Sequence, residues 1–113
     1  MVEINAYSEA ASGGKQLSAH FKVREFACGD GSDAVLVAPR LVMVLETIRT
    51  HFGTAVRINS GYRTPQYNAK VGGVAHSQHC YGTAADITVR GQAPATVAAF
   101  ARQIMPDWGG VGV

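Results

Sequence analysis

The stretch SQHCYGTAADITV, residues 77–89, decides how the rest of the sequence is interpreted. It places the imidazole of His79 and the carboxylate of Asp86 on either side of Gly82, which permits a tight or left-handed turn. A catalytic zinc ion is usually held by three protein groups drawn from His, Asp, Glu and Cys, with a fourth position left for water or substrate. The stretch therefore supplies two candidate metal ligands. A hydrogen-bonded histidine–aspartate pair without a metal is the alternative.

The second half of this stretch predicts a strand over residues 84–89. Side chains on a strand alternate between its two faces, so Ala85, Ile87 and Val89 share one face and Asp86 lies on the other. We expect the apolar face to pack on the core and Asp86 to point away from it.

Proline and glycine mark where the neighbouring elements begin and end. Pro39 suits the first position of a helix, and apolar residues recur at helical spacing from there until Gly53. The remaining elements follow from the same signals and from alternation of apolar and polar residues. The expected elements are a helix over 39–52, a strand over 55–59, a short helix over 65–70, the strand over 84–89, a helix from 94 that ends before Pro106, and the start of a strand over 109–113.

The domain organisation is simple. With 113 residues, of which 47% are hydrophobic and 16% charged, the chain fits one globular domain. Residues 1–16 are rich in Ser and Gly and lack a periodic apolar pattern, which predicts an extended arm. The domain proper is expected over residues 17–113.

Composition also excludes several classes of function. The net charge of +2 comes from dispersed residues, without the basic stripe that nucleic-acid binding requires. No apolar run is long enough to cross a membrane, and the first residues lack the pattern of a secretory signal, so we expect a protein that is cytoplasmic as synthesised. Cys28 and Cys80 are far apart in the sequence and are expected to be free thiols.

Arg63 is a candidate for substrate binding. It follows the predicted strand over 55–59, at a turn where a rigid scaffold would hold its side chain. A guanidinium there can grip a carboxylate with two parallel hydrogen bonds, although a surface ion pair is the more common role of such an arginine.

His76 is a weaker candidate for a third ligand. It precedes His79 by three residues, a spacing that would place both imidazoles on one face of a helix. The nearby glycines argue against a helix, and the glutamate of an H-E-x-x-H zinc site is absent.

These residues carry a resemblance to a known family. The pattern Ser77-x-His79-x-x-Gly82-x-Ala84-x-Asp86, preceded by SGYRTP at residues 60–65, resembles the zinc D-Ala-D-Ala carboxypeptidases, peptidase family M15. The likeness extends from about residue 17 to the glycines at 109–112. It is strongest to the small members found in bacterial cell-wall hydrolases and phage lysins.

The resemblance implies an α+β fold of the hedgehog/DD-peptidase type, in which helices pack on an antiparallel sheet that carries a zinc ion. It implies that His79 and Asp86 are two of the three zinc ligands, that Arg63 binds or polarises the substrate, and that Ser77 lines the site with its hydroxyl. The implied substrates are peptidoglycan stem peptides, with the protein acting on the bacterial cell wall after release or as part of a phage particle.

The resemblance further implies that the third ligand, a histidine, and the general base lie in a strand after the glycines at 109–112. The sequence stops at Val113, so we expect a family domain without that final strand. His76, Cys80 or a neighbouring molecule could supply the third ligand, whereas no motif nominates Glu25, Glu46 or Asp107 as the base. The alternatives to a peptidase are a cell-wall peptide-binding module and a structural phage component of the same fold.

Overall fold

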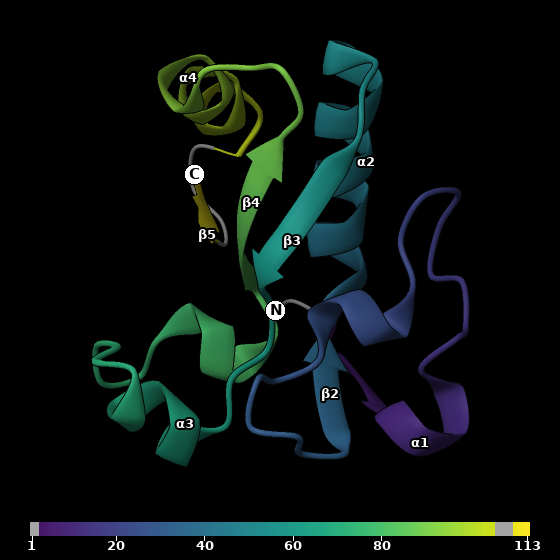
Figure 1. Cartoon of the computed structure of the whole chain (residues 1–113), viewed down its shortest axis with the longest axis vertical. Helices are drawn as coiled ribbons and strands as arrows, with labels where there is room; N and C mark the ends of the chain where they lie inside the picture. Colours follow the sequence, from purple (N-terminus) through teal and green to yellow (C-terminus); the bar gives the residue numbers. More distant parts are fainter. Residues whose placement is uncertain (1–2, 106–109) are drawn as a thin grey trace.

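The computed structural model describes residues 3–105 and 110–113. Its strands form two small sheets, which occupy different halves of the molecule (Figure 1). One sheet pairs β1 (Asn5–Ser8) with β2 (Ala34–Val37), and the other has the order β3–β4–β5. Among the described residues, no helix is long and apolar enough to cross a membrane.

The three-stranded sheet positions Asp86. Its central strand β4 (Ala84–Val89) pairs antiparallel with β3 (Val56–Ser60) and parallel with β5 (Gly110–Gly112). The sheet is therefore mixed, whereas the resemblance implies an antiparallel one. The pairing of β4 with β5 is parallel because the chain passes between these two strands through a helix and not through a hairpin. Asp86 is paired with Ser60 on one side and Gly112 on the other.

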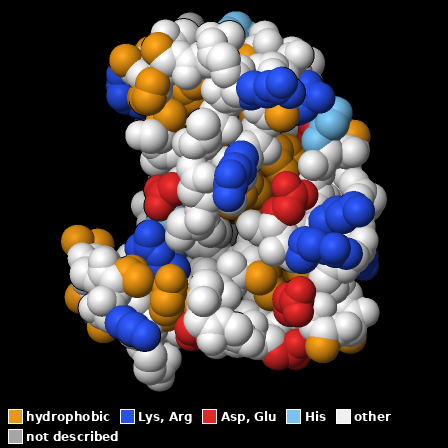
Figure 2. All heavy atoms as spheres, in the orientation of Figure 1, with side chains coloured by type: hydrophobic (Ala, Val, Ile, Leu, Met, Phe, Trp, Pro, Cys, Tyr) orange, Lys and Arg blue, Asp and Glu red, His pale blue; other side chains and the backbone are white. Residues whose placement is uncertain are grey.

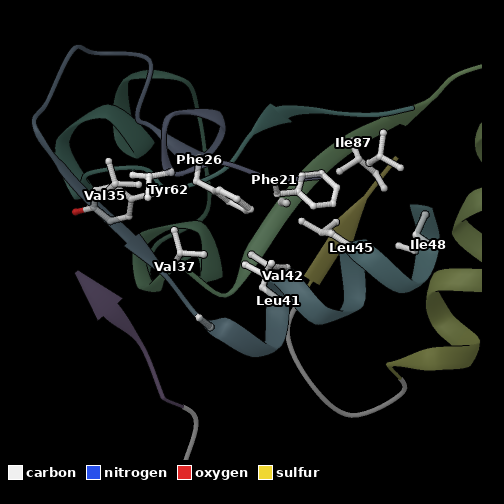
Figure 3. Packing of buried hydrophobic residues seen from close by; sticks show 14 of the residues in the cluster. Phe21, Phe26, Val35, Val37, Leu41, Val42, Leu45, Ile48, Tyr62 and Ile87 are labelled. Atoms are coloured by element: carbon white, nitrogen blue, oxygen red, sulfur yellow. The ribbon is translucent and has the colours of Figure 1, made fainter. Parts of the chain in front are cut away.

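Two long helices, α2 (Pro39–Phe52) and α4 (Pro94–Ile104), pack on this sheet and on each other. Both have proline in the first turn, and α2 ends before Gly53, as predicted. Gly53 has a left-handed backbone conformation, which is common for the residue that follows a helix. The buried face of α2 meets the apolar face of β4 and the phenylalanines near the 3₁₀ helix η1 (Val23–Phe26) (Figure 3). This apolar packing is the main stabilising contribution in the domain.

The N-terminal segment differs from the expected extended arm. It forms β1 and the short helix α1 (Glu9–Ser12), and β1 is held by its pairing with β2. Asp33 strengthens the connection, since its carboxylate accepts hydrogen bonds from the Ala10 amide at 2.8 Å and the Ser8 hydroxyl at 2.7 Å. These two hydrogen bonds lower the pKa of the Asp33 carboxyl below its usual range, and the bond from the Ala10 amide has the larger effect.

Candidate metal centre

His79 is held in one orientation. It lies in the 3₁₀ helix η2 (Gln78–Tyr81), with 9% of the residue exposed. Its Nδ1 lies 2.6 Å from the carbonyl oxygen of Gly61, and because a carbonyl can only accept, Nδ1 carries the proton and donates. In the neutral ring, Nε2 is then the nitrogen with the free lone pair. A backbone carbonyl that fixes the tautomer in this way is the usual support for a metal-bound histidine.

Nε2 of His79 faces Oδ2 of Asp86 at 3.4 Å. This separation is longer than the roughly 2.7–3.2 Å of an ordinary N–H···O hydrogen bond. Two ligands bound to a tetrahedral zinc ion at about 2.0–2.2 Å would be about 3.3–3.5 Å apart. The observed distance between Nε2 and Oδ2 therefore fits two atoms that share one cation.

Asp86 points away from the core, as the alternation in β4 predicted. Ala85, Ile87 and Val89 are buried on the opposite face, while the Asp86 side chain is 40% exposed. The carboxylate thus lies where an ion and a substrate can reach it from solvent.

Arg63 completes the cluster through three side-chain contacts. Its Nη2 lies 3.4 Å from Asp86 Oδ2, Nε donates to Ser60 Oγ at 3.2 Å, and Nη1 donates to Asn68 Oδ1 at 3.3 Å. Its backbone amide also donates to the carbonyl of His79 at 3.1 Å. With only 18% of its side chain exposed, Arg63 is held in the site and is not an ordinary surface residue.

The surface is indented between β5 and α3 (Pro65–Lys70), and acidic and basic side chains gather beside this indentation (Figure 2).

Ser77 lies on the inner side of the cluster. Its residue exposure is 8%, and its hydroxyl accepts a hydrogen bond from the His79 amide at 3.2 Å. Ser77 therefore caps η2 and helps to hold His79.

Asn68 is a site residue that the sequence did not reveal. It is 4% exposed, accepts the Arg63 hydrogen bond through Oδ1 and donates through Nδ2 to the carbonyl of Val74 at 2.8 Å. Its position in the middle of the short helix α3 was a weak signal, because asparagine is a poor helix former.

The described residues do not supply a third metal ligand. In residues 3–105 and 110–113, no group of three or more His, Cys, Asp or Glu side chains could hold a metal ion. His76 is exposed and has a left-handed backbone, and its Nδ1 lies 3.4 Å from the Tyr81 hydroxyl. Cys80 follows His79 but belongs to no such group, and Cys28 and Cys80 are both free thiols.

The other acidic candidates are engaged elsewhere or lie outside the description. Glu25 accepts the amide of Lys22, and Glu46 accepts the amide of His20, both at 2.7 Å. Asp107 lies outside the described residues. His79 Nε2 and Asp86 Oδ2 are thus close enough to share an ion, while Glu25 and Glu46 each accept a backbone amide elsewhere in the fold.

The α+β fold and the cluster of histidine, aspartate and arginine beside one sheet are compatible with the class of small α+β peptidases. A comparison with protein families gives a more specific result, because the family model described as Peptidase M15 matches residues 11–113. The chain belongs to the peptidase M15 family. This match and the mixed α+β structure confirm the family and fold class predicted from the sequence. The chain has no match among the curated proteins or among the solved structures.

Proposed function

We propose that this peptidase M15 domain is a zinc metallopeptidase that cleaves peptidoglycan stem peptides, of the D-Ala-D-Ala carboxypeptidase or endopeptidase type. The observation that carries the proposal is the pair of His79 Nε2 and Asp86 Oδ2, which face each other at 3.4 Å while Nδ1 of His79 is fixed by Gly61. Family membership supports peptidase chemistry, and the M15 family is generally zinc-dependent.

His79 and Asp86 would hold the zinc ion. When bound, zinc in such a site supplies Lewis-acid polarisation of a carbonyl and lowers the pKa of a water ligand. Arg63 is held beside this pair by Ser60 and Asn68, so its charge is available to orient a substrate carbonyl or carboxylate without first reorganising. Low exposure of Arg63 strengthens this electrostatic effect, because less water screens the guanidinium.

One observation favours a second candidate function. Since the described residues contain no third ligand, the domain could recognise cell-wall peptides through Arg63 and the adjoining surface without hydrolysing them. This would be a peptide-binding module of the same fold.

Zinc content tests the proposed centre. We expect the purified protein to retain about one zinc ion per chain after dialysis and His79→Ala to lose it, because the substitution removes a ligand. His51→Ala is the matched control, since His51 stacks on Phe100 with the ring centroids 3.8 Å apart and takes no part in the site. Equal zinc in both variants would contradict the assignment of His79.

Digestion of purified peptidoglycan separates the two candidate functions. Release of D-alanine or of new amino termini supports the peptidase and excludes the binding module. Arg63→Ala should lower this release by about 10²-fold or more, as expected for loss of a group that stabilises developing charge. The control Arg57→Ala, on the exposed side of β3, should leave the release unchanged.

A further inference from the structure

The loop between η1 and β2 carries two aspartates that are alike in chemistry but connect to different parts of the fold. Asp30 and Asp33 are both exposed, and each accepts one hydrogen bond from a hydroxyl and one from a backbone amide. Asp33 holds the N-terminal segment, whereas Asp30 reaches Thr64, the residue that follows Arg63 in the chain. The loop therefore lies beside the start of α3 (Figure 1).

The carboxylate of Asp30 is fixed within its own loop. Its Oδ1 accepts the Ser32 amide at 2.9 Å, and the Gly31 amide donates at 3.3 Å to the carbonyl of Cys28, a residue of the buried core. Hydrogen bonds, of which the one from the Ser32 side chain has the largest effect, hold the pKa of the Asp30 carboxyl well below its ordinary range. The group is therefore an anion at neutral pH, and it can only accept hydrogen bonds.

This restriction sets the direction of the hydrogen bonds at Thr64. The threonine hydroxyl has one proton, which it donates to Oδ2 of Asp30 at 3.0 Å. Its oxygen has lone pairs left, and it accepts the amide of Tyr67 at 3.1 Å as the N-cap of α3. Asp30 therefore orients the group that caps the helix.

A packing contact joins the same loop to α3. The hydroxyl of Tyr67 lies so close to Gly29 that an added Cβ atom there would be 2.7 Å from the tyrosine oxygen. The absence of a side chain at Gly29 is what allows this approach. The loop and the first turn of α3 are thus in contact through packing as well as through a hydrogen bond.

The first turn of α3 in turn holds Arg63. The amide of Asn68 donates to the carbonyl of Thr64 at 2.9 Å, and Oδ1 of Asn68 accepts from Nη1 of Arg63 at 3.3 Å. Arg63 also directly precedes the cap, so the start of the helix fixes its backbone. A continuous series of contacts thus runs from Asp30 through Thr64 and Asn68 to the guanidinium.

We infer that Asp30 is a positioning residue for the proposed peptidase, because it acts through Thr64 and the first turn of α3 to hold Arg63 in the site. The inference rests on the proposed function, since it takes Arg63 as the group that orients the peptide. Asp30 acts on Arg63 and not on the zinc ligands. Its loss should therefore slow hydrolysis while the zinc content stays the same.

The matched variants Asp30→Ala and Asp33→Ala test the inference, since each loses a carboxylate with the same kinds of partner from the same loop. The measurement is the rate at which new amino termini or D-alanine are released from purified peptidoglycan. We expect Asp30→Ala to lower this rate about three- to tenfold, the size of effect that follows when a helix cap is weakened. Asp33→Ala should leave it unchanged. Equal losses in the two variants would overturn the positioning role.

Thr64 separates positioning from a general loss of stability. Thr64→Val removes the hydroxyl and keeps the shape of the side chain, whereas Thr64→Ser keeps the hydroxyl. Because Asp30 acts through this hydroxyl, Asp30→Ala should have its full effect in the Thr64→Ser background and little further effect in the Thr64→Val background. A further loss in Thr64→Val as large as that in the wild type would overturn the inference.

Nuclear magnetic resonance of the Arg63 side chain gives a readout that does not depend on activity. Its Nε proton, which is donated to Ser60 Oγ at 3.2 Å, should exchange with water faster in Asp30→Ala than in the wild type, but not in Asp33→Ala. Unchanged exchange in Asp30→Ala would overturn the inference. Failure of the proposed function is recognised separately, because the wild-type protein itself would then hold no zinc or release no product.

Discussion

The face of α2 and the segment from Ser60 to Asp86 bury side chains for different reasons. On α2 the buried side chains are apolar, with Leu45 and Ile48 0% exposed. In the described chain, the buried polar side chains are those of Asn68, Ser77 and His79, all within the second segment. Each of the three takes part in a hydrogen bond. Because an unpaired buried polar group is costly, these bonds hold the site in one geometry while the apolar region supplies stability.

The difference predicts that substitutions in the apolar region lower stability and leave the chemistry of the site intact. Leu45→Ala should lower the free energy of unfolding by about 2–5 kcal/mol, because it removes a fully buried side chain and leaves a cavity. Urea denaturation measures the loss. Met43→Ala, at a position of the same helix that is 69% exposed, should change stability by less than about 0.5 kcal/mol. Loss of zinc from a Leu45→Ala variant that is still folded would contradict the expectation that the apolar packing affects stability without affecting the site.

Asn68 tests the opposite expectation, that a substitution among the buried polar side chains between Ser60 and Asp86 changes the chemistry of the site as well as the stability. Asn68→Ala should lower the free energy of unfolding by about 1–3 kcal/mol, because Arg63 and the carbonyl of Val74 both lose a buried partner. It should also reduce peptide affinity or turnover, since Arg63 is then less firmly held. Asn59→Ala is the control, as Asn59 is exposed and makes a hydrogen bond to Thr88 on the sheet surface. Equal effects of the two substitutions would refute a special role for Asn68.

Gly112 offers a change that acts on the site with little effect on stability. A Cβ atom at Gly112 would collide with Oδ1 of Asp86, whereas one at Gly110 would make an ordinary 3.5 Å contact with Cβ of Ala84. The Asp86 carboxylate can turn aside, so Gly112→Ala should move it away from His79 at small cost in stability. We expect zinc affinity to fall by about 10–100-fold in Gly112→Ala, as for other residues that orient a ligand.

Competition with a chromogenic zinc chelator measures this affinity. Gly110→Ala should bind zinc as tightly as the wild type. The same affinity in both variants would show that the approach of β5 to Asp86 does not control the centre.

Glu46, a partly buried residue of α2, gives the smallest expected effect. Burial raises the pKa of its carboxyl, but hydrogen bonds from Ser18 and His20 outweigh burial and lower it below the ordinary 4.5. A carboxyl with a lowered pKa in the folded state contributes stability above its unfolded pKa, and this is lost as pH falls through the folded value.

Glu46→Gln should therefore be less stable than the wild type at about pH 7, by no more than about 1 kcal/mol, and the difference should shrink below about pH 4.5. Thermal unfolding of both proteins across this range measures it. A difference that grows towards acid pH would contradict the sign. Zinc content should be the same in both proteins at neutral pH.

Local signals in the sequence were sufficient to predict the helices and the strand that carry the site. Proline and glycine marked α2 and α3, and alternation placed Asp86 on the open face of β4. The pairing of β1 with β2 was not predictable in this way, because strands of four residues carry little periodicity and gain their stability from each other.

The support around the site depends on contacts between distant residues. Gly61 fixes the tautomer of His79 across eighteen positions of sequence, and Arg63 meets Asp86 across twenty-three. The role of Asn68 likewise depends on how α3 places its amide between Arg63 and Val74. The candidate ligands could be named from the sequence, but the residues that orient them required the fold.

Anomalous diffraction at the zinc absorption edge, from crystals of the protein grown with zinc, tests the central claim most directly. The account predicts a peak bound by Nε2 of His79 and the carboxylate of Asp86, with Nδ1 of His79 still donating to Gly61. Zinc bound elsewhere, or His79 and Asp86 separated by solvent alone, would contradict it.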